Sequence, residues 1–350
     1  MIEVALAERG FIPDFLIRMG IRARLQNTLD EVTEPTEALA QIRKQKWIAE
    51  LRQSPIALVP EKANEQHYEL PPEFFKMALG GHLKYSSGYW PEKETTLDGS
   101  ESEMLQLSCE RAELADGQDI LELGCGWGSL SLWMASHYPN SNILAVSNSN
   151  DQRKFIMGKA LKLGLKNLRV ETADMNDFGT EQIYDRVISI EMFEHMRNYE
   201  SLMERITVWL KPGGKLFVHI FTHDQIAYPF LDRGPEDWMT RFFFTGGQMP
   251  SHDLLPQFAT SHLKHSESWK VNGRNYAKTS RAWLKKTDQS RPAIINLFKL
   301  TYGADQARVW FHRWRLFFMA CEELFNFKGG DEWYVSHYLF TKLDSHMEGT

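Results

Sequence analysis

From residue 118 to residue 221, short apolar runs alternate with segments in which apolar residues recur at helical spacing. The runs predict strands at 120–123, 143–147, 168–171, 186–190 and 215–221. The segments between them predict helices at 129–137, 151–163 and 199–210, and a short one at 181–184. Strands that alternate with helices build a mostly parallel sheet covered by helices. This part of the chain is therefore predicted to be α/β.

The flanking regions follow other patterns. Residues 1–60 have helical periodicity, and the first apolar face is bordered by Arg18, Arg22 and Arg24. A basic amphipathic helix can lie on a membrane surface, but packing on its own domain is the more common outcome, so membrane contact is not expected. Residues 101–117 predict a helix that ends at a glycine.

The alternation breaks down between residues 222 and 300, where aromatic residues and glycines gather. We interpret this range as an insertion that caps the site. Apolar runs at 266–271 and 333–340 predict the last two strands, with a long amphipathic helix at 305–325 between them. The expected architecture is a Rossmann-like seven-stranded sheet: an N-terminal helical extension (1–65) followed by one domain (66–350) that carries the cap.

Composition narrows the class of protein. The chain has 350 residues, of which 43% are hydrophobic and 25% charged, as in soluble globular proteins. A net charge of −6 without a Lys/Arg stripe argues against a nucleic-acid partner. Three widely spaced cysteines favour neither a disulfide framework nor a metal site. No apolar run reaches the roughly 18 residues of a membrane span, and no signal peptide is evident, so we expect a cytoplasmic protein. The sequence leaves the oligomeric state open, and a homodimer is one possibility.

A glycine-rich turn follows the first strand. Gly124, Gly126 and Gly128 stand at alternate positions, and Glu122 lies two residues before them. Glycine permits positive φ and leaves no Cβ in the way, so a ligand can approach the backbone. The spacing differs from the G-x-G-x-x-G of dinucleotide sites. An ordinary tight turn is the alternative interpretation.

The next two strand ends offer groups for a nucleoside. Ser147, Asn148 and Gln152 follow the second strand, where a hydroxyl and an amide suit a ribose diol. Asp174 and Met175 follow the third strand, where the carboxylate can accept from an adenine amino group and the thioether can pack on the ring. The alternative is that Asp174 is a simple loop residue.

The fourth strand ends in the densest group of ionisable residues. Glu191, Glu194 and His195 fall within five positions, and in a helical turn they would share one face. Such a group can attract a cationic amine and remove its proton, so we predict that these three are catalytic. Acids favoured by a helix dipole, with a structural histidine, are the alternative. His219 and His223 at the next strand end are expected to join the cavity.

The run 83–90 mixes aromatic, hydroxyl and glycine residues, as in a loop that closes over a ligand. The hydroxyls of Tyr85 and Ser86 are predicted to hold the polar end of the cofactor, although a buried turn is equally compatible. Four aromatic residues complete the predicted substrate pocket: Tyr89, Phe221, Phe243 and Tyr276.

Taken together, several motifs resemble the cyclopropane-fatty-acid-synthase superfamily of S-adenosylmethionine-dependent methyltransferases. They are the run 122–128, Tyr85–Trp90, Ser149-x-x-Gln152 and Met192-Phe-Glu-His195. Glu191–Met196, Asn198-Tyr199 and motifs in the C-terminal half are more similar to the coclaurine N-methyltransferase-like branch. The resemblance covers residues 65–342.

The resemblance implies a class I methyltransferase fold, S-adenosyl-L-methionine as cofactor with S-adenosyl-L-homocysteine as product, and no metal. It assigns the three catalytic residues to amine binding and deprotonation, and Glu191 also to the cofactor site. The lipid-cyclopropanating branch, whose members use a bound bicarbonate, remains the alternative. Its anion pocket resembles Cys125, Glu194, His219 and Tyr276, but it has a glycine at the position of Glu191.

The glycine turn generates a first test. Replacement of Gly126 by valine should abolish cofactor binding, because a side chain there would fill the path of the ligand. Isothermal titration calorimetry with S-adenosylhomocysteine measures this directly. Unchanged affinity would remove Gly126 from the cofactor site.

Overall fold

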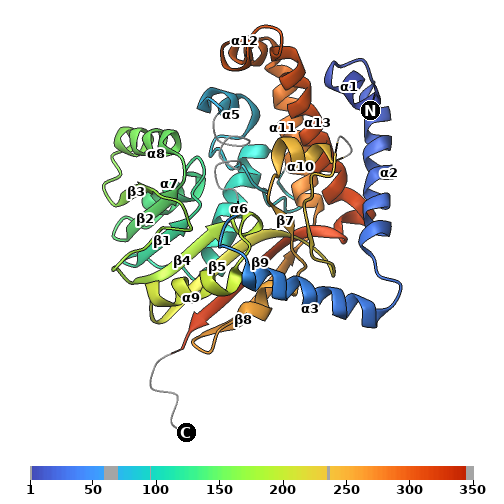
Figure 1. Ribbon diagram of the computed structural model, residues 1–350. Coiled ribbons are helices and arrows are strands. Elements are labelled where there is room, and N and C mark those ends of the chain that lie inside the picture. The colour runs from blue at the N-terminus through green and yellow to red at the C-terminus, as the bar shows by residue number, and fades with distance from the viewer. Residues whose placement is uncertain (1, 59–69, 95, 235–236, 344–350) are drawn as a thin grey trace.

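A computed structural model describes residues 2–58, 70–94, 96–234 and 237–343. Its centre is a seven-stranded sheet in the order β3-β2-β1-β4-β5-β9-β8, and the first five strands of the chain run parallel (Figure 1). β9 enters antiparallel between β5 and β8. The strands are β1 (Asp119–Leu123), β2 (Asn142–Ser147), β3 (Leu168–Thr172), β4 (Tyr184–Ile190), β5 (Leu210–His223), β8 (Leu263–Val271) and β9 (Trp333–Lys342). All seven predicted strands are confirmed.

Helices cover both faces of the sheet. The side chain of Leu121 packs with α9 residues on one face, whereas Ile120 packs with residues of α6, α7 and α8 on the other. This alternation is the period-2 pattern of a strand buried on both sides. The helices in question are α6 (Leu97–Arg111), α7 (Ser129–His137), α8 (Asn150–Leu163) and α9 (Tyr199–Trp209).

A third core, rich in aromatic rings, lies above strands β5 and β9 of the sheet (Figure 1). It joins the N-terminal helices to the helices near the C-terminus. Its elements are α1 (Ile2–Glu8), α2 (Asp14–Val32), α5 (Pro72–Ala78), α10 (Trp238–Phe243), α11 (Arg274–Gln289), α12 (Arg291–Tyr302) and α13 (Ala307–Asn326). α3 (Glu37–Gln53) instead packs with α9, through Ile48 and Leu51.

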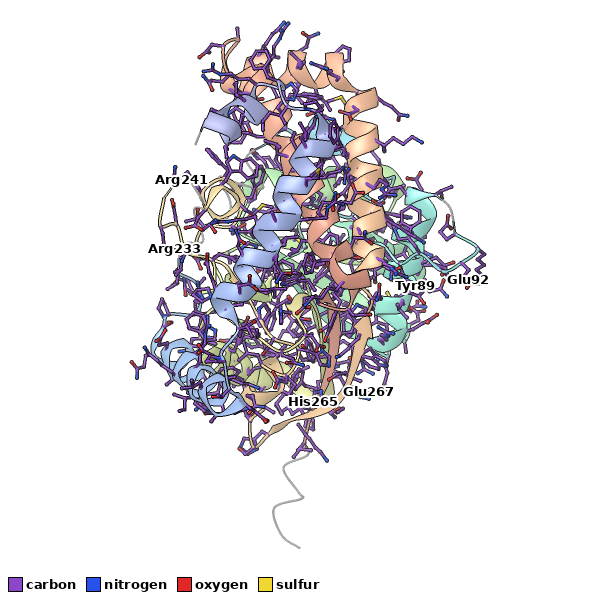
Figure 2. All side chains as sticks on the ribbon, turned by 90° about the vertical axis from the view of Figure 1, so that its right-hand side faces the viewer. Tyr89, Glu92, Arg233, Arg241, His265 and Glu267 are labelled. Atoms are coloured by element: carbon purple, nitrogen blue, oxygen red, sulfur yellow. The ribbon has the colours of Figure 1, made fainter. Side chains whose placement is uncertain are left out.

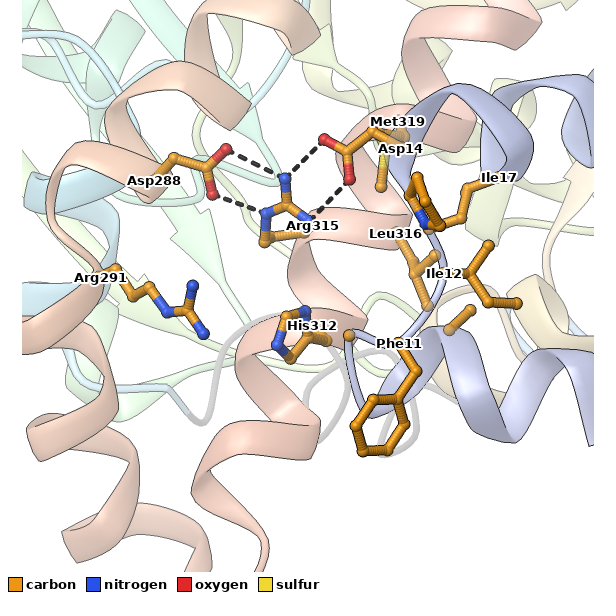
Figure 3. A pocket seen from close by; sticks show the side chains of 13 residues that line it. Phe11, Ile12, Asp14, Ile17, Asp288, Arg291, His312, Arg315, Leu316 and Met319 are labelled. Carbon is orange, nitrogen blue, oxygen red and sulfur yellow. Dashed lines mark hydrogen bonds and ion pairs between the residues drawn. The ribbon is translucent and has the colours of Figure 1, made fainter.

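Helix α2 uses its arginines internally. Arg18 donates to the buried carboxylates of Glu322 and Glu323 on α13, at 2.6 and 2.7 Å. Arg315 of α13 bridges Asp14 and Asp288, which joins α2 to α11 as well (Figure 3). Buried carboxylates require such partners. The basic face of α2 that is visible in the sequence therefore packs on its own domain.

Three segments differ from prediction. The short helix predicted at 181–184 is wrong: Tyr184 is the first residue of β4 and pairs with Leu210, and four residues cannot offset the cost of nucleating a helix. The helix predicted at 101–117 starts at Leu97 and ends at Arg111. The predicted cap range contains β8, α11 and part of α12, so two segments flank β8 instead of one continuous insertion. The predicted boundary at 65/66 lies outside the described residues.

The strand order creates a switch point between β1 and β4. From β1 the chain builds β2 and β3 on one side, and it then returns to place β4 on the other side. Ligands of open α/β sheets bind at the carboxyl ends of strands at such a point. Here that position holds the turn after β1 (Gly124 onwards) and the residues after β4 (Glu191 onwards).

Candidate functional site

Two adjoining cavities open at the switch point, and both are lined by Gly124, Gly126 and Glu191. Almost all of the predicted cofactor residues lie in their walls. The first cavity is also lined by Ser147, Asn148, Gln152, Asp174, Met175 and His195, and the second by Lys84, Tyr85, Ser86, Glu122, Cys125, Trp127 and Ser129.

The glycine turn has the predicted conformation. φ is +80° at Gly124, +52° at Gly126 and +79° at Gly128, in the left-handed region that favours glycine. A Cβ on Gly126 would meet nothing within 4 Å, so that position faces open cavity space. A Cβ on Gly128 would lie 2.6 Å from the Ile156 side chain. Gly128 therefore lies outside both cavities and serves the packing of α7 against α8.

The first cavity offers a directed donor. The Ser147 hydroxyl donates to Gln152 Oε1 at 2.6 Å, which turns the amide so that its nitrogen is buried without a hydrogen-bond partner. An unpaired buried donor is costly unless a ligand satisfies it. Asp174 already accepts from the backbone N–H of Asn176 at 2.7 Å. This cavity fits the diol and base of a nucleoside.

The second cavity contains a buried cation that the sequence analysis missed. Lys84 Nζ donates to Ser86 Oγ at 2.5 Å and to the Ser87 carbonyl at 2.8 Å. Burial lowers the pKa of Lys84 to about 8, although the nearby Glu191 and Glu101 raise it. Trp127 Nε1 and Ser129 Oγ are buried there without partners. These donors suit the amino-acid end of a cofactor.

Glu191 lies where the two cavities meet, and it is a non-glycine residue with φ +47°. Its backbone N–H donates to the His219 carbonyl at 2.8 Å, which fixes the turn. Its carboxylate accepts from the Tyr276 hydroxyl at 2.9 Å and lies 3.4 Å from His219 Nε2. Burial raises the pKa of Glu191 to about 7, whereas the Tyr276 hydrogen bond and the Lys84 charge lower it. Strain of this kind is typical of functional positions.

Glu194 and His195 lie on the short 3-10 helix η1 (Phe193–His195). Glu194 is buried, its Oε2 has no hydrogen-bond partner, and burial and then the Glu191 charge raise its pKa well above the usual range. Burial lowers the pKa of His195 to about 4, and its ring stacks near Phe244. Glu191 precedes η1, so the shared helical face that the spacing suggested does not exist. The left-handed backbone of Glu191 directs its carboxylate into the cavities instead.

Only two of the six residues predicted for the substrate pocket lie at the site. His219 and Tyr276 reach Glu191, as described above. His223 is engaged elsewhere, since it contacts Glu332 at 3.1 Å and accepts from two backbone N–H groups. Phe243 stacks on Phe317 within the aromatic core. Phe221 packs among the rings of Phe230, Phe244 and Phe325, and Tyr89 lies on the same outer loop as Glu92 (Figure 2). The side chains of His223, Phe243, Phe221 and Tyr89 therefore line neither cavity.

The segment after α3 forms part of the wall. The backbone N–H of Arg197 donates to the Ile56 carbonyl at 2.7 Å, and Asn198 Nδ2 donates to the carbonyls of Arg52 and Ser54. Ala57 itself lines the first cavity, together with Thr245 and Gly246 from the cap. No sequence motif marks these wall residues.

Another pocket, of about 420 Å³, opens between α1–α2 and α12–α13 around His312 and Arg315 (Figure 3). None of the predicted site residues lines it.

Among the described residues, no His, Cys, Asp and Glu cluster has the arrangement of a metal site. The helices of that same part of the chain include none with the length and apolar character of a membrane span. Cys109, Cys125 and Cys321 are free thiols.

Known proteins share this architecture. (S)-coclaurine N-methyltransferase of Thalictrum flavum subsp. glaucum is 36% identical over 343 residues, which cover 96% of this chain and 94% of that enzyme. The crystal structure of a coclaurine N-methyltransferase bound to N-methylheliamine and SAH superposes with a TM-score of 0.94 at 35% identity, covering 97% of this chain and 99% of the other. Cyclopropane-fatty-acyl-phospholipid synthase of Escherichia coli (strain K12) is 27% identical over 81% of this chain and 69% of that enzyme.

The cofactor follows from the site and these relatives together. The open glycine turn, the unpaired Gln152 amide and the donors of the second cavity fit S-adenosylmethionine, and the protein is an S-adenosylmethionine-dependent methyltransferase. The model for mycolic acid cyclopropane synthetase matches residues 59–333. The chain belongs to this family.

Proposed function

We propose that the protein transfers a methyl group from S-adenosylmethionine to the nitrogen of a small amine, and that Glu191 is the base. The observation that carries this proposal is the buried Glu191 carboxylate at the junction of the two cavities. Tyr276 holds one of its oxygens, and the other lies 3.4 Å from His219 Nε2 and makes no hydrogen bond among the described residues. A cationic amine would bring a charged donor to that second oxygen. A neutral alkene would bring none.

The chemistry requires a free lone pair on the amine. The cofactor, when bound, supplies an electrophilic methyl group on a sulfonium. An ammonium cannot attack it, so a base must first remove a proton. A pKa of about 7 suits Glu191 to this role near neutral pH. Glu194, whose pKa burial raises, and His195, whose pKa burial lowers to about 4, then orient the amine by hydrogen bonds.

The surroundings favour an amine that carries a ring. His195 stacks near Phe244, which in turn contacts Phe221 and Phe230. These rings lie behind His195, which lines the first cavity, and they make that side of the site apolar, which favours a flat, apolar body. The relatives are named for (S)-coclaurine, and the matched crystal structure holds N-methylheliamine. We therefore propose an aromatic or alicyclic amine as substrate.

The second candidate is a lipid methyltransferase of the cyclopropane-fatty-acyl-phospholipid synthase type, which the family match and the E. coli relative support. One experiment separates the two. The purified protein is incubated with methyl-labelled cofactor and either a panel of ring-bearing amines or vesicles of unsaturated phospholipid. We expect label in an N-methyl product only. Label in the acyl chains and none in any amine would overturn the proposal.

Replacement of Glu194 by glutamine, or of His195 by alanine, should lower turnover about a hundredfold, because each removes a group that orients the reacting amine. Cofactor affinity should stay nearly unchanged. Steady-state kinetics and calorimetry measure the two quantities. Glu204→Gln, at an exposed glutamate of α9, is the matched control. A collapse of cofactor binding in either site variant would make these residues structural.

Glycine and alanine at position 191 separate function from backbone strain. Both replacements remove the carboxylate and should abolish turnover. Glycine adopts φ +47° freely, whereas alanine does not, so Glu191→Gly should be about 1 kcal/mol more stable than Glu191→Ala. Urea denaturation compares the two. Equal stabilities would show that the left-handed turn relaxes in the variants, and retained turnover would exclude Glu191 as base.

The raised pKa of Glu191 predicts a pH profile for kcat/KM. The amine binds as an ammonium and gives its proton to Glu191, so only Glu191 must first lose a proton to the solvent. kcat/KM should therefore rise tenfold per pH unit below about pH 7 and level off above it. Glu191→Gln has no base, depends on amine that is already neutral in solution, and should keep rising through pH 7. An unchanged profile in this variant would contradict the assignment.

Stability should respond to pH in the opposite sense. The folded-state pKa of about 7 lies above the ordinary glutamate pKa of 4.5, so between these two pH values the folded protein binds one more proton than the unfolded chain. The contribution of Glu191 to the free energy of unfolding therefore falls as the pH rises through this window, while activity rises.

A further inference from the structure

A row of hydrogen-bonding side chains crosses the sheet and ends at Glu191. Strand register aligns Trp269 of β8 with His337 of β9, and His337 with His219 of β5. His219 in turn lies beside Ile190, the last residue of β4, which directly precedes Glu191. The row therefore runs through four neighbouring strands on the face that α6 covers.

Two short hydrogen bonds and one longer contact link this row. Arg111, the last residue of α6, approaches His337 Nδ1 with its Nη1 at 2.9 Å. His337 Nε2 lies 2.9 Å from His219 Nδ1. His219 Nε2 lies 3.4 Å from Glu191 Oε1, and neither of these two atoms makes a hydrogen bond among the described residues. Both histidine rings are completely buried.

The direction of each hydrogen bond follows from the first. A guanidinium can only donate, so His337 Nδ1 must be the acceptor and the ring proton must lie on Nε2. That proton is donated to His219 Nδ1, which forces the proton of His219 onto its own Nε2. His219 then presents an N–H to Glu191. Burial, together with the nearby cations, lowers the pKa of both histidines well below the usual range, in agreement with neutral rings.

We propose that Arg111 and His337 are positioning residues for methyl transfer: the guanidinium sets the tautomers of two buried histidines so that His219 presents an N–H, not a lone pair, to Glu191. His219 cannot then accept the substrate's proton. Instead it and Tyr276 present donors to opposite oxygens of one carboxylate, which aims that carboxylate at the amine. This role rests on the proposed function, but the tautomers themselves do not.

The outer end of the row is stabilised separately. The Arg111 guanidinium lies over the Trp269 ring, 5.0 Å from its centroid. Burial lowers the pKa of Arg111, whereas the nearby Tyr89 and Glu267 raise it. Figure 2 shows Glu267 near the lower end of the molecule and Tyr89 on an outer loop. Trp269 therefore provides a control, because its replacement removes a ring that contacts the guanidinium but leaves the N–H groups of Arg111 that donate to His337.

The test is the ¹⁵N spectrum of the histidine rings in the full chain, since the two neutral tautomers have distinct nitrogen shifts. We expect His219 and His337 of the unmodified protein to carry their protons on Nε2. Arg111→Met should mix the tautomers and lower kcat about tenfold with cofactor affinity unchanged, as for other residues that orient a functional histidine. Arg111→Lys, which keeps an N–H donor, should recover most of the Nε2–H tautomer population and most of kcat. Trp269→Leu should change neither the tautomers nor kcat.

Two results would overturn the proposal: an Nδ1–H tautomer at His219 in the unmodified protein, or unchanged tautomers in Arg111→Met. If Arg111→Met does not fold, the ¹⁵N spectra of the unmodified protein and of Arg111→Lys still test the proposed tautomers. Absence of amine methylation with Nε2–H tautomers at both rings would instead count against the proposed function alone.

Discussion

The burial of one carboxylate in a left-handed turn is the constraint on which the site depends. The Glu191 carboxyl group is buried and its backbone has a strained, positive φ, and each of these conditions is unfavourable by itself. The Tyr276 hydroxyl, the Lys84 charge and the backbone bond to His219 offset these costs. They come from α11, from the loop before α6 and from β5. The carboxylate is therefore held in position only when the cap, the loop and the sheet have assembled around the switch point.

The N-terminal helices belong to the same assembly. Residues 52–57 hydrogen-bond to the chain directly after His195, and Ala57 lines the first cavity. At its other end the extension is joined to α13 by Arg18 and Arg315. The N-terminal extension thus connects α13 to the turn that carries Glu191, Glu194 and His195. Motion of α13 relative to that turn would have to break the buried ion pairs of Arg18, so this connection favours a closed site.

Local patterns predicted the strands, the glycine turn and the strand-end residues, because burial on both faces and positive φ leave direct marks in a sequence. Lys84, Arg111 and His337 left none. The proposed role of Arg111 and His337 depends on register across β9, the last strand in sequence, which enters between β5 and β8. Lys84 lies in a loop and is brought to the site by the packing of that loop. The helical face expected for Glu191, Glu194 and His195 failed for a related reason: spacing alone cannot show that φ at the first residue is positive.

The charge state of the site suits two cations. Near neutral pH His195 is uncharged, Glu191 lies near its midpoint and Lys84 is mostly charged. Burial lowers the pKa of His219 and His337 and raises that of Glu194, which favours the neutral form of each. A sulfonium and an ammonium that enter together would lower the pKa values of both carboxyl groups. Ionised Glu191 is then both the counter-ion of the cofactor and the acceptor of the amine proton. A neutral alkene would bring only the first of these charges and no proton for Glu191 to accept, which favours an amine as the methyl acceptor.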